Sequence, residues 1–458
     1  MMATPATQAE GAFAPPSSQS SDETARIYRK ITLRLIPFLF ICYVAAYLDR
    51  INIGFAQLQM KQDLGFSDAV YGLGAGIFFF GYMLFEVPSN LLLAKFGARK
   101  TLLRIMVVWG LISAGMMFVQ TPAQLYIARF LLGVFEAGFF PGIILYLTYW
   151  YPSGMRARII ALFMSGIAIA GILGGPLSGW IMNDLAGMNG WKGWQWMFLI
   201  EGLPAVALGI LVLFILDDRP GDANWLSARE KGIVNDTLER DQLGLGSAHH
   251  HSLRQALRDP RIYLLSFAYF TFIAGTYVIT FWLPTIIKGF GITDPMRIGL
   301  LTAIPYVAGA IGMVAISRHS DKTRERRWHT AACAFVGAAG LVAATFLHGD
   351  LPWALAALAI ATIGILATMP LFWAMPTAYL TGAAAAGGIA LINSLGLIGG
   401  FVSPFVIGWI KTATGSVDNG LYFMSALLVL GGVVLLAGVP ASALREPRGD
   451  AGSGSRAR

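Results

Sequence analysis

The sequence of 458 residues is too apolar for a water-soluble protein. Hydrophobic residues make up 56% of it and charged residues only 13%, against about 25% in an ordinary soluble protein. Mean hydropathy is +0.63, and the apolar runs are too long for the strands of a membrane barrel, which need about ten residues each. We expect no nucleic-acid partner despite the net charge of +8, because the charge follows membrane topology. The composition predicts an all-α protein in a lipid bilayer.

The chain begins with a polar stretch, residues 1–25, which is rich in Ala, Pro, Ser and Thr. We expect a disordered tail here and no signal peptide, since the stretch lacks an apolar core. Twelve apolar runs follow, and a polar interruption divides them into six and six. The predicted organisation is a six-helix bundle at 26–216, a linker at 217–261, a second six-helix bundle at 262–443 and a tail at 444–458.

Lys and Arg residues predict the orientation of these spans. They are concentrated in the loops on the side that also holds both termini, above all at 95–104 and 318–327. Short basic loops stay in the cytoplasm. We therefore expect a multi-pass protein whose termini and linker are all cytoplasmic.

The two halves resemble each other in their fifth spans. Residues 174–181 read GGPLSGWI and residues 399–410 read GGFVSPFVIGWI. Gly171, Gly175 and Gly179 are four residues apart, which places them on one helix face and allows close helix approach. Parallel-repeat transporters have such internal similarity, so the sequence predicts two pseudo-symmetric bundles. A chance match between glycine-rich helices is the alternative interpretation.

Deep charges occur only in the first half. They are Asp49, Arg50, Glu86, Arg129 and Glu136. A charge at mid-span costs at least about 2.5–3.5 kcal/mol, so it is expected to face a partner or water. We expect Asp49 and Arg50 to lie against the span that carries Arg129 and Glu136, around a water-accessible centre. The alternative is a set of structural ion pairs, which we favour for Glu86 alone.

Such a cluster can couple two ligands. An arginine that faces a cavity can hold a carboxylate by two parallel hydrogen bonds. If a substrate anion takes over the arginine, the protein carboxylate loses its cationic partner and binds a proton more readily. Binding of substrate and proton then reinforce each other, which is the thermodynamic content of symport.

The sequence has no motif of an enzyme or of a metal site. It contains no Walker A, GxSxG or HExxH pattern, so we expect neither catalysis nor ATP as the energy source. Cys42 and Cys333 lie in apolar runs and fit packing roles, and the histidines at 249–251 lack further ligands. We expect no cofactor, with protons as the coupling ion and sodium as the less favoured alternative.

Four motifs carry a resemblance to a known family. They are YLDRINIGFA at 47–56, GYMLFEVPSN at 81–90, KFGARK at 95–100 and RFLLGVFEAGFFPG at 129–142. Together they resemble the major facilitator superfamily, and within it the anion:cation symporter family of bacterial tartrate, phthalate and 4-hydroxyphenylacetate permeases. The resemblance implies twelve transmembrane helices in two six-helix bundles, alternating access and a location in the bacterial inner membrane.

The resemblance also implies a substrate site. Arg50 would bind the substrate carboxylate, and Tyr47 and Tyr82 would line the pocket. Trp373 and Asn393 would form the opposite wall.

It further implies proton-coupling residues. Asp49 and Glu136 would bind the protons, and Arg129 would tune Glu136.

The loops after the second span of each half resemble the gate motifs of the superfamily. The matching gate residues are Gly97, Arg99, Lys100, Asp321 and Lys322. Asn90 stands where the superfamily has Gly, and Ala94 stands where it has an acidic residue. We therefore expect a weaker latch at the inner gate of the first half.

The sequence thus predicts a monomeric, proton-coupled importer of a small organic anion. A tartrate-like dicarboxylate, a sugar acid or an aromatic carboxylate would all suit one arginine with hydroxyl and aromatic walls. A proton-driven efflux antiporter of metabolites or drugs on the same fold is the main alternative. A membrane receptor is disfavoured, because the linker is too short for a signalling domain.

Overall fold

The computed structural model describes residues 18–245, 258–379 and 382–438, and these residues form helices and loops without a strand. The helices of the first half are α1 (Ser18–Leu64), α2 (Asp68–Phe96), α3 (Ala98–Gly115), α4 (Pro122–Glu136), α5 (Phe139–Thr148), α6 (Ser153–Met164), α7 (Gly166–Asp184) and α8 (Gly193–Ile215). After α9 (Ala228–Leu245), those of the second half are α11 (Pro260–Lys288), α12 (Pro295–Thr323), α13 (Arg327–Thr345), α14 (Leu351–Tyr379), α15 (Gly382–Thr414) and α16 (Asp418–Gly438). Three 3₁₀ turns lie at Met116–Phe118, Met188–Gly190 and Pro220–Asp222.

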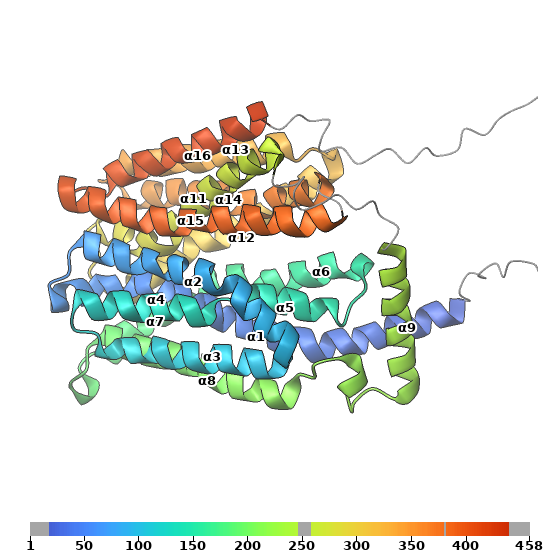
Figure 1. Ribbon diagram of the computed structural model, residues 1–458. Coiled ribbons are helices and arrows are strands. Elements are labelled where there is room, and N and C mark those ends of the chain that lie inside the picture. Colours follow the sequence, from blue (N-terminus) through green and yellow to red (C-terminus); the bar gives the residue numbers. More distant parts are fainter. Residues whose placement is uncertain (1–17, 246–257, 380–381, 439–458) are drawn as a thin grey trace, which may run out of the picture.

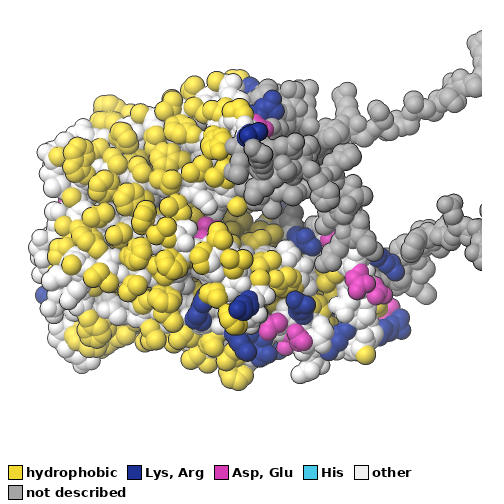
Figure 2. All heavy atoms as spheres, in the orientation of Figure 1, with side chains coloured by type: hydrophobic (Ala, Val, Ile, Leu, Met, Phe, Trp, Pro, Cys, Tyr) yellow, Lys and Arg dark blue, Asp and Glu magenta, His cyan; other side chains and the backbone are white. Residues whose placement is uncertain are grey.

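Twelve helical stretches of the described chain are long and apolar enough to cross a membrane. Large apolar side chains such as Phe214, Ile311 and Phe346 are exposed on the outside, where a bilayer would cover them. Figure 2 shows apolar side chains over most of one face, with Lys and Arg gathered towards one end. The predicted all-α membrane fold with two six-helix bundles is confirmed.

Helix ends define two sides of the molecule. α1 begins, α16 ends and α9 lies at one end, which we call the α9 side (Figure 1). The other end, where α1 is followed by α2 and α15 by α16, we call the opposite side.

The two halves meet through their fifth and second spans, which explains the internal repeat. α7 packs on α12, and α15 packs on α2, so each repeated segment contacts the other half. The glycines allow this, because a Cβ at Gly175 would lie 2.5 Å from the carbonyl oxygen of Gly299. A Cβ at Gly408 would lie 2.4 Å from the carbonyl oxygen of Asp68. Both distances are too short for any side chain, so the repeat serves contact between the halves.

The fourth span is broken into α4 and α5. Gly138 has a φ of +86°, a left-handed conformation that glycine adopts without strain. A Cβ at this position would also lie 2.3 Å from Ser89 Oγ, so the break lies close against α2. The interruption leaves Glu136 as the last residue of α4.

The predicted tail contains more helix than expected, and the predicted linker contains a helix as well. α1 begins at Ser18, so residues 18–25 are helical although the sequence predicts a disordered tail over 1–25. The predicted linker at 217–261 contains α9, because this amphipathic segment finds partners on α1. Lys30 Nζ lies 2.9 Å from Glu230 Oε2. The predicted tail at 444–458 and residues 1–17 lie outside the described residues.

Candidate functional site

Arg50 lies between the two halves, at the centre of the molecule. Its Nη2 pairs with Glu136 Oε1 of α4, and its Nη1 donates to the Tyr277 hydroxyl of α11 at 3.3 Å. The Arg50 side chain is 16% exposed, whereas that of Glu136 is 1% exposed. An arginine in this position holds a charge within reach of water while its partner is enclosed.

Aromatic rings surround the Arg50 guanidinium. Its Cζ lies 5.8 Å from the ring centre of Tyr47, 5.6 Å from that of Tyr82 and 5.2 Å from that of Phe78. Rings at these distances attract a cation and exclude water from part of its surface. The predicted neighbours of Arg50, Tyr47 and Tyr82, do lie beside it; Phe78 and Tyr277 were not predicted.

Asp49 points away from this centre. It accepts hydrogen bonds from Trp109 Nε1 at 2.6 Å, Ser113 Oγ at 2.7 Å and Asn52 Nδ2 at 3.3 Å, and it is fully buried. Successive residues of a helix point about 100° apart, so Asp49 faces α3 when Arg50 faces α4 and α11. The expectation that both residues lie against the fourth span therefore holds for Arg50, which pairs with Glu136, and is wrong for Asp49.

Arg129 is bound to α2 and not to Glu136. Its Nε donates to the Gly74 carbonyl at 3.3 Å and its Nη2 to the Ala75 carbonyl at 3.5 Å. Its guanidinium also lies 4.9 Å from the ring centre of Phe78, which Arg50 contacts as well. Seven residues of helix separate Arg129 from Glu136 by about 10.5 Å along the axis. Arg129 therefore acts on Glu136 through the field of its charge and not through a hydrogen bond.

The predicted opposite wall is divided between two contacts. Trp373 Nε1 donates to the Tyr269 hydroxyl at 3.2 Å, within the second half. Asn393 Nδ2 donates to Glu86 Oε1 at 3.1 Å, across the two halves. Glu86 therefore joins α2 to α15, in agreement with the structural role favoured from the sequence.

The gate residues of the first half find an acidic partner that the motif comparison missed. Asp218, just after α8, accepts a hydrogen bond from the Arg99 backbone amide at 2.9 Å. Arg99 Nη2 donates to the Leu213 carbonyl, and Gly97 packs against the Asp218 carboxylate. Lys100 is exposed. The residues around the missing acid at Ala94 are thus tied to α8 and the linker.

The gate residues of the second half lie in the last turn of α12. Asp321 Oδ1 lies 2.7 Å from Arg326 Nη2, and Lys322 is exposed.

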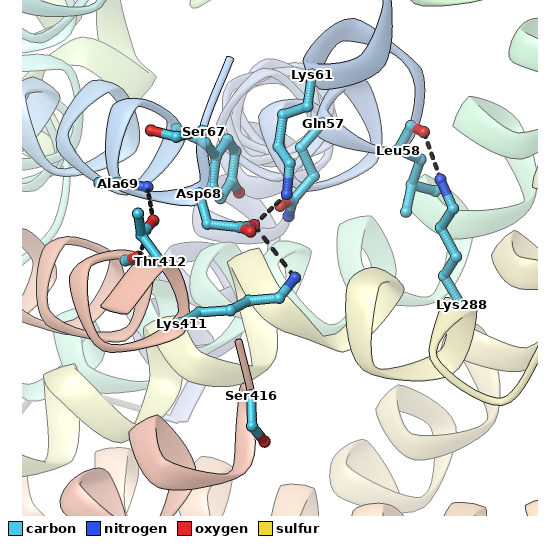
Figure 3. Close-up of polar contacts among 12 residues, drawn as sticks. Gln57, Leu58, Lys61, Ser67, Asp68, Ala69, Lys288, Lys411, Thr412 and Ser416 are labelled. Atoms are coloured by element: carbon cyan, nitrogen blue, oxygen red, sulfur yellow. Dashed lines mark hydrogen bonds and ion pairs between the residues drawn. The ribbon is translucent and has the colours of Figure 1, made fainter. Parts of the chain in front are cut away.

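Access to the centre differs between the two sides. On the opposite side the halves are joined by Lys411 to Asp68, by the Ala69 amide to Thr412 and by Lys288 to the Leu58 carbonyl (Figure 3). On the α9 side a hollow separates the halves (Figure 2). The described structure is therefore closed on the opposite side and open towards α9.

The described residues include no group of three or more His, Cys, Asp or Glu side chains that could hold a metal ion. The chemistry available at the centre is that of the Arg50 guanidinium, the Glu136 carboxylate and aromatic hydroxyls, which suits binding of an anion.

Several named proteins are similar to this chain over most of its length. The chain is 49% identical over 417 residues to a "Putative tartrate transporter" of Agrobacterium vitis, covering 91% of this chain and 92% of that protein. It is 45% identical to the "Putative metabolite transport protein NicT" of Pseudomonas putida, covering 90% and 94%. It is 44% identical to a "Quinolone resistance transporter" of Acinetobacter baumannii, covering 88% and 93%. The relatives are transporters, in line with the absence of an enzyme motif.

Solved structures give the same fold. A bacterial homologue of the human lysosomal transporter Spinster, in an inward-facing and occupied conformation, superposes with a TM-score of 0.71 at 17% identity, covering 90% of this chain and 98% of that one. The sequence profile of the Major Facilitator Superfamily matches residues 39–404. The similarity to a named tartrate transporter is consistent with the anion:cation symporter branch. This chain belongs to the major facilitator superfamily.

Proposed function

We propose that this protein imports a small organic anion together with protons by alternating access. The observation that carries the proposal is Arg50, a part-exposed cation between the two halves whose only carboxylate partner among the described residues is the enclosed Glu136. A substrate carboxylate that reaches the space between the halves can pair with this guanidinium. A tartrate-like dicarboxylate, a sugar acid or an aromatic carboxylate would fit beside Tyr47 and Tyr82.

The coupling follows from competition for one guanidinium. A substrate carboxylate that forms two parallel hydrogen bonds with Arg50 displaces Glu136. Glu136 then lies in a water-poor site without its cation, and it takes up a proton. By linkage, a proton on Glu136 in turn frees Arg50 for the substrate. Asp49 is the second carboxylate that can hold a proton, although it acts at a separate, fully buried position.

The number of protons sets the energy of uptake. A monoanion that enters against an inside-negative potential costs about 2.3 kcal/mol per 100 mV. One proton cancels this charge, and a dianion needs two. Glu136 and Asp49 together suffice for either.

We place the α9 side in the cytoplasm, because the basic loops at 95–104 and 318–327 lie there. The described conformation then faces inward, and the protein works as a monomer in the bacterial inner membrane.

The test uses purified protein in proteoliposomes with radiolabelled tartrate. Uptake should rise when the exterior is more acidic than the interior, and Arg50→Ala should abolish it. A thermal-shift screen against a panel of carboxylic acids identifies the preferred anion, since a ligand stabilises by RT ln(1 + [L]/Kd). Uptake that does not respond to the pH gradient, but follows a sodium gradient, would remove the proton assignment.

A second candidate is proton-driven efflux, favoured by the similarity to a relative named for quinolone resistance. The two functions differ in direction. Export would give accumulation of a quinolone when the compartment that receives it is acidic, with no accumulation of tartrate.

A further inference from the structure

Three lysines lie on the opposite side of the molecule, and two of them pair with the same carboxylate (Figure 3). Lys61, Lys288 and Lys411 lie in the last turns of α1, α11 and α15, and Asp68 is the first residue of α2. Asp68 pairs with Lys61, and its Oδ1 also lies 3.2 Å from Lys411 Nζ. We call Lys61, Lys288 and Lys411 the lysine cluster.

The lysine cluster carries more positive charge than its surroundings neutralise. Lys288 Nζ donates to the Leu58 carbonyl at 2.7 Å, which is a neutral partner. Asp63, another acid on this side, accepts a hydrogen bond from Trp194 Nε1 and lies 3.6 Å from Lys192 Nζ. Among the described residues, Asp68 is therefore the carboxylate that pairs with the cluster, and it pairs with two of the three lysines.

Helix ends explain why three lysines can gather here. The C-terminal carbonyls of a helix attract cations, and the N-terminus of a helix attracts an anion. Each lysine stands at the C-terminal end of its helix and Asp68 at the N-terminal end of α2. The helices hold the positive charge in place when the carboxylate moves away.

The contacts of Asp68 cross the boundary between the halves. Asp68 and Lys61 belong to the first half, whereas Lys411 belongs to the second. Opening of this side must separate Asp68 from Lys411. The lysine cluster then loses part of the carboxylate charge that pairs with it among the described residues, at the moment when the path to the centre opens.

We propose that the lysine cluster is an initial binding site for the anionic substrate, and that the Asp68 carboxylate occupies it while this side is closed. The inference rests on the proposed function, because it needs an anion that arrives from this side. A substrate carboxylate replaces Asp68 among the lysines, and its arrival favours the open conformation. The substrate then moves on to Arg50.

The decisive experiment compares Lys411→Gln with Asp68→Asn in proteoliposomes, with tartrate uptake measured at low and high ionic strength. Both variants break the Asp68–Lys411 pair. If the pair were only a latch, both would ease opening and lower the KM for external substrate. If the cluster binds the anion, Lys411→Gln removes an attracting charge and raises KM, whereas Asp68→Asn removes a competitor and lowers it.

The expected size of the KM change follows from the removal of one unit charge near the bound anion. At about 7 Å in water it changes binding about threefold, so Lys411→Gln should raise KM about threefold at low salt. The difference should shrink as the ionic strength rises beyond about 0.1 M, where the Debye length is about 10 Å. Lys411→Arg should behave as the wild type.

Two further variants serve as a control and as an independent repeat of the Lys411 test. Lys192→Gln removes the same charge from the same side but away from the cluster, and it should leave KM unchanged. Lys288→Gln should raise KM like Lys411→Gln. It can replace Lys411→Gln in the test if the Lys411 variant is not monodisperse.

Opposite shifts of KM support the inference. Shifts of KM of the same sign in Lys411→Gln and Asp68→Asn would overturn it, and so would a shift in Lys192→Gln as large as that in Lys411→Gln. In either case, uptake by the wild type would leave the proposed function intact. A wild type that imports no carboxylate of the panel would overturn both.

Discussion

Arg50 pairs with Glu136, 86 residues away in the sequence, and not with Asp49, its immediate neighbour. The pair brings together α1 and the end of α4, directly before the break at Gly138. The two carboxylates that the sequence predicts as equivalent proton sites therefore have different surroundings. A substrate carboxylate can displace Glu136 from Arg50, whereas Asp49 accepts hydrogen bonds from groups of α3.

Glu136→Gln should separate substrate exchange from accumulation. The amide of Gln can still accept a hydrogen bond from Arg50, but it carries no transferable proton. We expect exchange of labelled for unlabelled substrate across the membrane to continue, while accumulation driven by a pH gradient is lost. Counterflow and gradient-driven uptake in the same proteoliposomes measure the two. Full accumulation by the variant would show that the proton binds elsewhere.

Asp49→Ala should destabilise the protein more than Asp49→Asn. Loss of the carboxylate leaves the buried donors of Trp109 and Ser113 without an acceptor, and each costs about 1–3 kcal/mol. Asn keeps one oxygen acceptor. Thermal unfolding in detergent, with Ser113→Ala as the milder control, should rank the three variants. Equal melting temperatures for Asp49→Ala and the wild type would contradict this account of Asp49.

Gly138→Ala should impair both stability and transport. The φ of +86° strains any residue with a Cβ, at a cost of order 1–3 kcal/mol, and the new methyl would clash with Ser89 Oγ. The displaced α4 end would carry Glu136 away from Arg50. Gly154→Ala in α6 is the matched control, because a Cβ there meets no atom within 4 Å. The interpretation fails if both alanine variants transport like the wild type.

Attachment of α9 to α1 should weaken in acid. The backbone amide of Ser227 and the ammonium of Lys30 hold the pKa of Glu230 below its usual value. A depressed pKa in the folded state means that Glu230 stabilises this contact above the ordinary pKa of about 4.3, and that the contribution is lost as pH falls through the depressed value. Hydrogen exchange of α9 should therefore accelerate in acid.

Glu230→Gln should reproduce the acid state at neutral pH. Glu239→Gln, in an exposed position of α9, should leave the exchange unchanged. Identical protection of α9 in all three proteins would exclude a role for the Lys30–Glu230 pair.

Much of the site could be predicted because its residues are conspicuous in a membrane span. Arg50, Glu136 and Asp49 stand out as charges among apolar residues, and Tyr47 and Tyr82 lie in recognisable motifs. Tyr277 and Phe78 could not be singled out, because α11 and α2 are rich in aromatic residues without a pattern that separates the central ones. Asp218 could not be singled out from the sequence, because it lies in a polar stretch where acidic residues are common.

The sequence by itself determined the twelve spans, the division into halves and the charges that need an explanation, because insertion into a bilayer depends on the hydropathy of each segment alone. Only the tertiary structure decided which charges meet. Arg50 turned to Glu136, Arg129 to the carbonyls of α2 and Asp68 to two lysines from different halves, since these pairings depend on helix rotation and on close packing at glycines. Neither the rotation of a helix nor its packing against another helix can be predicted from the sequence of a single span.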